Sequence, residues 1–344
     1  MANWSSDVKR ILVVGGGLIG IRHLQAVQSN PNCELVGLAD PDMGIQLDVP
    51  RYATMEDVDR SVDGIIIATP THLHTAQGTE AAKRGWHMLI EKPVAGTLQD
   101  AQAFEAMLRN SSSRSLVGHH RRYHACVQQL KTLITGGRIG KVVNASLLWA
   151  MRKPDAYFNG NWRTVNGTPV MINLIHDIDL LRFCIGEITQ VAALRGGSVR
   201  GTSRVESGAI ALAFDNGATG TISFADTTPS PWGFEAGTGE NPNIGATQQD
   251  MMWITGTKGA ISFPSMALWE GNDWGAAAQR SPLEPAQSTQ SPLDAQLAHF
   301  IDVMNGSVPM IDVADATRTL AVATDIETQL AAQTMVVNQH NKTV

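Results

Sequence analysis

The stretch KRILVVGGGLIG, residues 9–20, decides the fold. Its apolar first half is typical of a buried strand, and a helical stretch begins after the glycines. The glycines have GxGxxG spacing, in which the first permits a tight turn, the second lets the backbone approach a pyrophosphate, and the third allows close helix–strand packing. The N-terminus of the following helix would offer free N–H groups to the phosphates. We therefore predict a dinucleotide site at Gly15, Gly17, Leu18, Ile19 and Gly20.

Asp40 follows a second apolar segment, at 34–39, and lies 20 residues after Gly20. A carboxylate at this position accepts hydrogen bonds from the ribose hydroxyls and repels a 2′-phosphate. No arginine adjoins Asp40 in the sequence, so NAD is favoured over NADP as cofactor. A purely structural glycine turn beside an acidic loop residue is the alternative, and the strand–turn–helix context argues against it.

Composition excludes several classes of protein. The chain has 344 residues, of which 43% are hydrophobic, and a net charge of −6 that gives no basic excess for nucleic acid. Its three cysteines form no CxxC pair, which fits a reducing cytoplasm better than a zinc ribbon or a redox dithiol. The polar N-terminus and the lack of a long apolar run predict neither a secretory signal nor a membrane helix. We expect a cytoplasmic protein without nucleic-acid or membrane partners.

The order of the apolar and helical segments predicts two domains of an α/β protein. Strand-like segments alternate with helical ones up to about residue 120, which indicates a parallel sheet. We therefore predict an N-terminal Rossmann domain at 1–120. Later β-rich runs predict a C-terminal α+β domain at 121–344 with a large open, mostly antiparallel sheet, and the last helix could pack back on the first domain.

Turn and loop signals add three expectations. Breaking residues in segment 43–54 predict that it lacks a full crossover helix. The Asp-Asn-Gly turn at 215–217 and the segment 256–259 predict hairpins. The long Pro/Gly-rich segment 226–250 is expected to cover the active site or a neighbouring subunit.

Several further motifs, taken together, resemble the Gfo/Idh/MocA oxidoreductases over nearly the whole chain. They are Ile66–Pro70 with His72 and His74, Glu91-Lys92-Pro93, Gly118–Arg122, the segment 162–182 that includes His176, and the 256–259 turn. The resemblance implies a Rossmann domain followed by a domain whose open sheet forms a homodimer or homotetramer. It also implies pyridine-nucleotide redox chemistry on sugars, cyclitols or their derivatives.

The same resemblance gives the cofactor-side residues. It makes Lys92 a proton relay at the carboxyl edge of the parallel sheet, where ligands bind; a surface lysine at a strand end is the alternative. Burial and the cationic nicotinamide would lower the pKa of that lysine. The resemblance also implies a cis Pro93. The other residues expected at the cofactor are Thr69, Pro70, His74 and Glu91, although a surface histidine at a helix start is an equal reading for His74.

His176 matches the histidine of the family's central helix and is the predicted general base, with a buried structural histidine as the alternative. Asp179 shares its helical face at i+3 and could orient the ring, contact substrate or make a structural hydrogen bond. Many sugar and inositol dehydrogenases of the family have an aspartate where this chain has Ile172, with Asn173 as the nearby polar residue. We therefore expect Lys92 and His176 to handle the proton in a cleft between the domains.

The remaining candidates concern the substrate. Residues expected to bind it are Arg121, Tyr157, Trp162, Arg163, Asn173 and Asp179. Lys153 is expected to be solvated, with service to an acidic substrate as the alternative. The HxH at 72–74 has no third ligand at metal spacing, so no metal is expected.

The leading hypothesis is an NAD-dependent dehydrogenase of a sugar or cyclitol alcohol. An NAD-dependent glycoside-cleaving enzyme of the same fold is an alternative, because redox at one carbon acidifies its neighbour and permits elimination. A non-catalytic dinucleotide-sensing regulator is the second alternative. A sensor would have no use for Lys92 and His176, which argues against it.

Overall fold

The computed structural model describes residues 8–44, 48–158, 168–241, 243–271 and 273–333. The chain divides into two compact units, the first made of 1–123 and 289–321 and the second of 124–288 and 322–344. These ranges differ from the predicted 1–120 and 121–344 because a late segment returns to the first unit. There helix α7 (Pro292–Met304) contacts the short helix η3 (His120–Tyr123). Helix α8 (Val313–Ala332) begins in the first unit and ends in the second.

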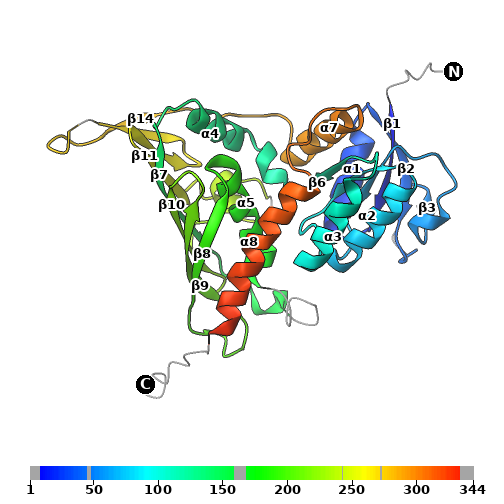
Figure 1. Ribbon diagram of the computed structural model, residues 1–344, viewed down its shortest axis with the longest axis horizontal. Helices are drawn as coiled ribbons and strands as arrows, with labels where there is room; N and C mark the ends of the chain where they lie inside the picture. Colours follow the sequence, from blue (N-terminus) through cyan, green and yellow to red (C-terminus); the bar gives the residue numbers. More distant parts are fainter. Residues whose placement is uncertain (1–7, 45–47, 159–167, 242, 272, 334–344) are drawn as a thin grey trace. The chain divides into compact units, whose positions relative to one another are not determined.

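The first unit is built on a six-stranded parallel sheet in the order β3-β2-β1-β4-β5-β6. This is the strand order of a Rossmann fold, as predicted, and Figure 1 shows the helices beside it. Its strands are β1 (Lys9–Val14), β2 (Cys33–Ala39), β3 (Arg51–Tyr52), β4 (Gly64–Ile67), β5 (His87–Ile90) and β6 (Ser115–Val117). Its other helices are α1 (Leu18–Ser29), η1 (Met55–Asp57), η2 (Thr71–Leu73), α2 (His74–Lys83) and α3 (Leu98–Leu108).

Strand β4, near the centre of this sheet, carries no polar side chain along its length. Ile65, Ile66 and Ile67 of β4 are fully buried, so both faces of the strand are covered, as is usual in parallel sheets. Between β2 and β4 the described residues form only the two-residue strand β3 and the single-turn helix η1. The prediction that 43–54 lacks a full crossover helix is confirmed for its described part.

The second unit is built on an eight-stranded sheet in the order β14-β13-β12-β11-β7-β10-β9-β8. Neighbouring strands are antiparallel except β7 and β10, which are parallel, so the predicted mostly antiparallel sheet is confirmed. Its strands are β7 (Val142–Ala150), β8 (Ile188–Arg195), β9 (Ser207–Phe214), β10 (Thr219–Ala225), β11 (Met252–Gly256), β12 (Gly259–Phe263), β13 (Ala267–Glu270) and β14 (Gln279–Pro282). The predicted turns 215–217 and 256–259 join β9 to β10 and β11 to β12.

One face of this sheet carries the helices and the apolar core (Figure 1). The core takes Leu130 from α4 (Ala125–Thr135), Ile178 from α5 (Ile175–Cys184) and Ile326 from α8. The opposite face alternates outward, as in β10, where Thr219, Thr221 and Ser223 are exposed between buried neighbours. Segment 226–250 contributes helix α6 (Phe234–Thr238), whose Phe234 is buried in the core of this unit.

Candidate functional site

The glycine turn after β1 has the conformation that a dinucleotide site requires. Gly15 has φ +99°, a backbone conformation that side chains disfavour, and a Cβ there would lie 2.6 Å from the carbonyl oxygen of Ala68. A Cβ on Gly20 would lie 1.9 Å from the carbonyl oxygen of Gly15. A Cβ on Gly17 would meet nothing within 4 Å. Gly15 and Gly20 are therefore required by the fold, whereas Gly17 leaves open space at the N-terminus of α1, where Leu18 is 93% exposed and Ile19 is partly buried.

Asp40 is fastened to this turn. Its Oδ2 accepts the N–H of Gly16 at 2.6 Å, and its Oδ1 accepts the N–H of Asp42 at 2.8 Å. The carboxylate therefore lies at the carboxyl end of β2, where a ribose is held in this fold. Arg51 of β3 pairs with β2 and donates to the carbonyl oxygen of Asp42 at 2.9 Å. Inspection of sequence neighbours missed this arginine because it reaches the region through the strand pairing.

His74 joins the loops that follow β4 and β5. Its Nδ1 lies 2.8 Å from the carbonyl oxygen of Pro93, and its Nε2 lies 2.8 Å from that of Thr69. A neutral imidazole donates from only one nitrogen, so both contacts can be hydrogen bonds only in the protonated ring. Burial lowers the pKa of His74, against the two carbonyl oxygens, which favour the protonated ring. The His74 residue is only 1% exposed, so it is not a surface histidine, and its ring connects the two loops.

Glu91 is a buried anion that anchors the loop after β5. Its Oε1 lies 2.8 Å from Nε2 of the buried His23 on α1. Burial by itself raises the pKa of Glu91, but the hydrogen bond and the charge of His23, with the charges of His120 and Lys92, hold that pKa at about 2. A Cβ on Gly118 would come within 2.9 Å of this carboxylate, so a glycine is needed beside it.

Lys92 is partly buried in the loop that Glu91 and His74 hold from two sides. Its backbone N–H donates to Glu91 Oε2 at 3.2 Å, and the peptide bond between Lys92 and Pro93 is cis, as the resemblance implied. Thr69, in the neighbouring loop, donates through Oγ1 to Gln77 at 2.6 Å. Pro70 follows it as the N-cap of η2. The predicted cofactor-side residues of the first unit therefore gather at the carboxyl ends of β1, β2, β4 and β5.

His176 lies in the second unit, on a helix that begins irregularly. Residues Val170–Leu174 form a π-helical turn, and α5 continues from Ile175. π-Helical turns are rare and occur often at functional sites. His176 is 6% exposed and Asp179 is 1% exposed, so both are buried polar residues on this helix. Arg121, predicted to bind substrate, is 2% exposed in η3 of the first unit.

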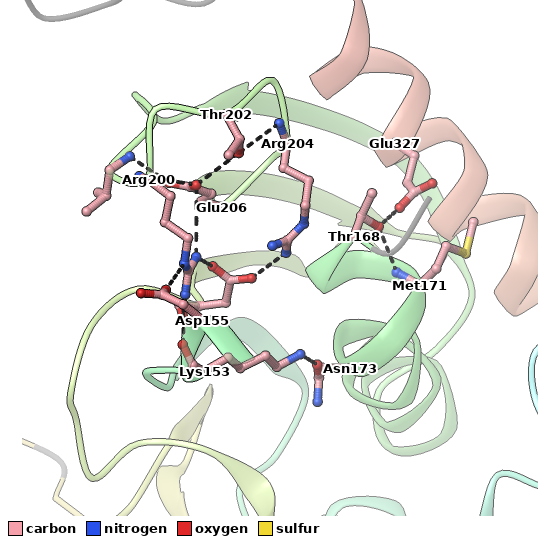
Figure 2. Close-up of polar contacts among 12 residues, drawn as sticks. Lys153, Asp155, Thr168, Met171, Asn173, Arg200, Thr202, Arg204, Glu206 and Glu327 are labelled. Atoms are coloured by element: carbon pink, nitrogen blue, oxygen red, sulfur yellow. Dashed lines mark hydrogen bonds and ion pairs between the residues drawn. The ribbon is translucent and has the colours of Figure 1, made fainter. Parts of the chain in front are cut away.

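Lys153 is buried beside Asn173, which corrects the expectation of a solvated lysine. Lys153 is 6% exposed, and its Nζ donates to Oδ1 of Asn173 at 2.5 Å (Figure 2). The ammonium also lies 4.9 Å from the ring centroid of Tyr157 and 5.5 Å from that of Trp149. The structure thus brings Lys153 and Tyr157, which are four residues apart, together with Asn173 from the following helical segment.

A charged network adjoins this group (Figure 2). Arg200 and Arg204 donate to the two carboxylate oxygens of the buried Asp226 at 2.6 and 2.5 Å. Both guanidinium groups lie over the ring of Phe158, at 4.9 and 4.0 Å from its centroid. A pocket of about 460 Å³ opens here, lined by Arg152, Asp155, Phe158, Val199, Arg200, Thr202, Arg204 and Thr227. Sequence analysis did not find this network, because its arginines carry no motif.

Two predicted substrate residues, Trp162 and Arg163, lie outside the described residues. Over the described ranges, no group of three or more His, Cys, Asp or Glu side chains could hold a metal ion. Nor does that part of the chain contain a helix long and apolar enough to cross a membrane.

Both units match family models. Residues 9–119 match the model described as "Oxidoreductase family, NAD-binding Rossmann fold", and residues 127–262 match the "GFO/IDH/MocA C-terminal domain". The chain belongs to the Gfo/Idh/MocA oxidoreductase family. The resemblance inferred from the motifs is therefore confirmed.

Individual members of the family are distant relatives. The chain is 26% identical over 343 residues to the scyllo-inositol 2-dehydrogenase (NAD(+)) of Bacillus subtilis, covering 91% of each protein. It is 28% identical over 228 residues to the uncharacterized oxidoreductase YrbE of the same organism, covering 61% of this chain and 65% of that protein. Its fold matches an oxidoreductase from Agrobacterium radiobacter, solved with NAD+, L-tartaric acid and magnesium, at a TM-score of 0.77 and 19% identity, over 94% of this chain and 97% of that one.

The residues of this Gfo/Idh/MocA protein fit the NAD of its family. Gly17 would bring the backbone to the pyrophosphate, since nothing lies within 4 Å of its would-be Cβ. The first-turn N–H groups of α1, at Leu18 and Ile19, point outward from the helix start and suit an anion. Asp40 is held by two backbone N–H groups, which leaves lone pairs on its oxygens for ribose hydroxyls.

Proposed function

We propose that the protein is an NAD-dependent dehydrogenase that oxidises a secondary alcohol of a sugar, a cyclitol or a derivative. The observation that carries the proposal is the turn in which Gly17 stays open while Asp40 is fixed to Gly16. That turn belongs to a chain of an NAD-binding oxidoreductase family. The B. subtilis relative named for scyllo-inositol and NAD(+) supports the alcohol class of substrate.

Oxidation of an alcohol removes a hydride and a proton. Bound NAD supplies the hydride acceptor, and the chain must supply the group that takes the proton. We assign this task to Lys92 and His176. Lys92 is held on a loop whose neighbours, Glu91 and His74, are themselves fixed by buried contacts. Glu91, whose pKa is held at about 2, is ionised at neutral pH and accepts the backbone N–H of Lys92, which fixes the loop that carries the lysine.

Substrate hydroxyls would be held mainly by the second unit. Asn173 precedes His176 by three residues, and Asp179 follows it by three, so all three side chains lie along one stretch of helix. Tyr157 offers an aromatic face to a sugar ring, and Arg121 is the candidate from the first unit. Because Ile172 replaces the family aspartate, the proposed mechanism contains no Asp–His pair at this position.

Replacing Lys92 and His176 tests the assignment. Lys92→Ala should lower kcat by a factor on the order of 10² to 10⁴, the usual contribution of a general acid or base. NAD binding should survive, because the glycine turn and Asp40 hold the nucleotide. His176→Ala should lower kcat similarly if it is the base, or mainly raise KM if it only positions substrate. Release of an aryl leaving group from aryl glycosides would instead support the glycoside-cleaving alternative.

We also propose that the exposed face of the second unit's sheet joins two or four copies of the chain. Strands β7, β9, β10, β11 and β12 contain no charged residue. Trp253 and Trp269 on this side of the sheet are 38% and 39% exposed. Such a face is typical of a surface covered in an oligomer. Thr221→Arg, in the middle of β10, should reduce the mass measured by light scattering, and an unchanged mass would argue against this interface.

Two smaller assignments complete the proposal. NAD should be preferred to NADP because the anchored Asp40 repels a 2′-phosphate. A cytoplasmic location is supported by the cysteines Cys33, Cys126 and Cys184, all of which are free thiols.

A further inference from the structure

His23 is a polar residue on the otherwise apolar buried face of α1. The other buried residues of this helix are Gly20, Leu24, Ala26 and Val27. His23 itself is 0% exposed, and its Nε2 lies 2.8 Å from Oε1 of Glu91. Because the ionised carboxylate of Glu91 can only accept, the histidine donates from Nε2. Among the described residues, Nδ1 of this ring has no hydrogen-bond partner, so the directed contact of the ring is the one with Glu91.

The buried pair of His23 and Glu91 is not explained by stability alone. Taking an imidazole and a carboxylate out of water costs free energy, and well-packed apolar side chains often stabilise a core as well or better. Burial raises the pKa of Glu91, yet the hydrogen bond and charge of His23, with the charges of His120 and Lys92, hold that pKa at about 2. The pair therefore keeps an ionised hydrogen-bond acceptor inside the first unit.

Glu91 extends this contact to the loop that carries Lys92. Its Oε2 accepts the backbone N–H of Lys92 at 3.2 Å, and its own backbone N–H donates to the carbonyl oxygen of Ile67, at the end of β4, at 2.9 Å. A Cβ on Gly118 would lie 2.9 Å from both carboxylate oxygens, so the chain after β6 packs closely on the carboxylate. The carboxylate has little room to move, and the ring that it contacts on α1 sets its place.

The same helix begins at the turn that would hold the pyrophosphate of NAD. Gly17 is the N-cap of α1, Gly20 lies in its first turn, and His23 follows Gly20 by three residues. A hydrogen-bonded helix is a rigid element, so a displacement of its first turn also displaces His23. One rigid element thus connects the cofactor turn with the contact that holds the Lys92 loop.

We infer that His23 is a positioning residue, which fixes the Lys92 loop relative to the helix that holds the cofactor. The inference rests on the proposed dehydrogenase function and adds a residue that acts on the reaction through Lys92. His23 is fully buried, so it does not itself touch substrate. Placement matters in catalysis because a displacement of about 1 Å can lower a rate by about 100-fold.

His23→Gln and His23→Met test the inference as a matched pair. Both new side chains are unbranched and of nearly equal length, but only glutamine has an amide N–H that can donate to Glu91. His23→Met should lower kcat by about 10- to 100-fold, and its Kd for NAD, measured by calorimetry, should not change. His23→Gln should recover most of kcat. Equal kcat values in the two variants would overturn the inference.

A double variant separates action through Lys92 from a general loss of structure. If His23 acts through Lys92, adding His23→Met to Lys92→Met should lower kcat no further, whereas independent effects would multiply. Multiplied losses would overturn the inference. Asp63→Asn is the matched control, because it breaks the 2.6 Å ion pair with Arg10 at the amino end of β4, away from the Lys92 loop. It should lower the unfolding temperature and leave kcat unchanged.

Hydrogen exchange measured by mass spectrometry gives a readout that does not need turnover. Because the Lys92 N–H donates to Glu91, a peptide spanning residues 88–96 should exchange faster in His23→Met than in His23→Gln or Asp63→Asn, with or without NAD. Equal exchange in the three variants would overturn the inference. If His23→Met fails to fold, His23→Met with Glu91→Leu leaves no unpaired buried charge and should fold with a similar loss of kcat. A wild-type kcat in that variant would also overturn it.

Failure of the inference and failure of the proposed function give different results. If the wild type oxidises a sugar or cyclitol and His23→Met does so at the same rate, the inference is wrong while the dehydrogenase function stands. If no compound is oxidised but the exchange of the 88–96 peptide still differs between His23→Met and His23→Gln, the proposed function is wrong while the positioning of the Lys92 loop stands.

Discussion

Glu327→Gln is expected to make the second unit more stable at neutral and alkaline pH. Glu327 lies on α8, and its carboxylate contacts the hydroxyl of Thr168, which in turn accepts the backbone N–H of Met171 at 3.2 Å (Figure 2). These contacts hold the start of the helical segment that carries Asn173 and His176. Burial raises the pKa of Glu327 from 4.5 to about 7, although the nearby Met171 N–H favours the charged form.

The size of the effect follows from that shift. Between pH 4.5 and pH 7 the folded protein keeps a proton on Glu327 that the unfolded chain has lost. The unfolded state binds fewer protons, so the free energy of unfolding falls as pH rises through this window. The stabilisation is complete below pH 4.5 and is lost as pH passes 7. A shift of this size corresponds to at most about 3 kcal/mol, at 1.36 kcal/mol per pKa unit.

Urea unfolding followed by tryptophan fluorescence, at a series of pH values from about 5 to 8.5, measures this loss for the unit. The glutamine of Glu327→Gln cannot ionise, so its advantage over the wild type should grow by up to about 3 kcal/mol across the series. Asp325→Asn is the matched control, because Asp325 is an exposed carboxylate on the same helix. Its curve should run parallel to the wild type. Parallel curves for Glu327→Gln and the wild type would refute the reasoning.

Other variants test the first unit. Gly20→Ala should reduce both stability and NAD affinity, since its Cβ would lie 1.9 Å from a backbone oxygen, whereas Gly17→Ala should fold normally and lose NAD affinity alone; equal thermal unfolding of the two variants would contradict this. Wild-type protein should bind NAD at least about tenfold tighter than NADP in calorimetry. Asp40→Ser should raise the affinity for NADP, because the carboxylate no longer repels the 2′-phosphate and Arg51 lies close enough to attract it, and adding Arg51→Ala should cancel that rise. A rise in NADP affinity that persists without Arg51 would show that Arg51 does not contact the 2′-phosphate. His74→Phe should lower the free energy of unfolding by about 1–3 kcal/mol, because the neutral ring that burial favours donates to one of two buried carbonyl oxygens, which would lose its donor; a loss below about 0.5 kcal/mol would show that the ring is dispensable.

Much of the fold could be predicted because local sequence and topology agree. The apolar runs at 11–14 and 64–67 are buried on both faces, a pattern typical of a covered parallel strand. The absence of a full crossover helix in the described part of segment 43–54 could be predicted from its helix-breaking residues. The return of α7 to the first unit could not be predicted, because the pairing of an amphipathic helix with a distant sheet leaves no local signal.

The parts of the candidate site that carry sequence motifs could be predicted, whereas the parts that depend on which side chains are buried could not. The glycine turn and Asp40 were recognised by their spacing in the sequence, and Gly15 and Gly20 have the tight backbone geometry that this spacing implies. Lys153 was misjudged because a lone lysine after a strand has no feature that distinguishes a buried ammonium from a solvated one. Arg51 was missed because only the pairing of β3 with β2 brings it near Asp42.

Formation of NADH from NAD, with a panel of neutral and acidic sugars and cyclitols, tests the central claim most directly. The measurement compares the wild type with Lys92→Met, after calorimetry has established that both bind NAD. The account predicts that the wild type oxidises at least one member of the panel and that Lys92→Met does so more slowly by a factor on the order of 10² to 10⁴. A wild-type rate in Lys92→Met, or bound NAD without oxidation of any compound, would contradict it.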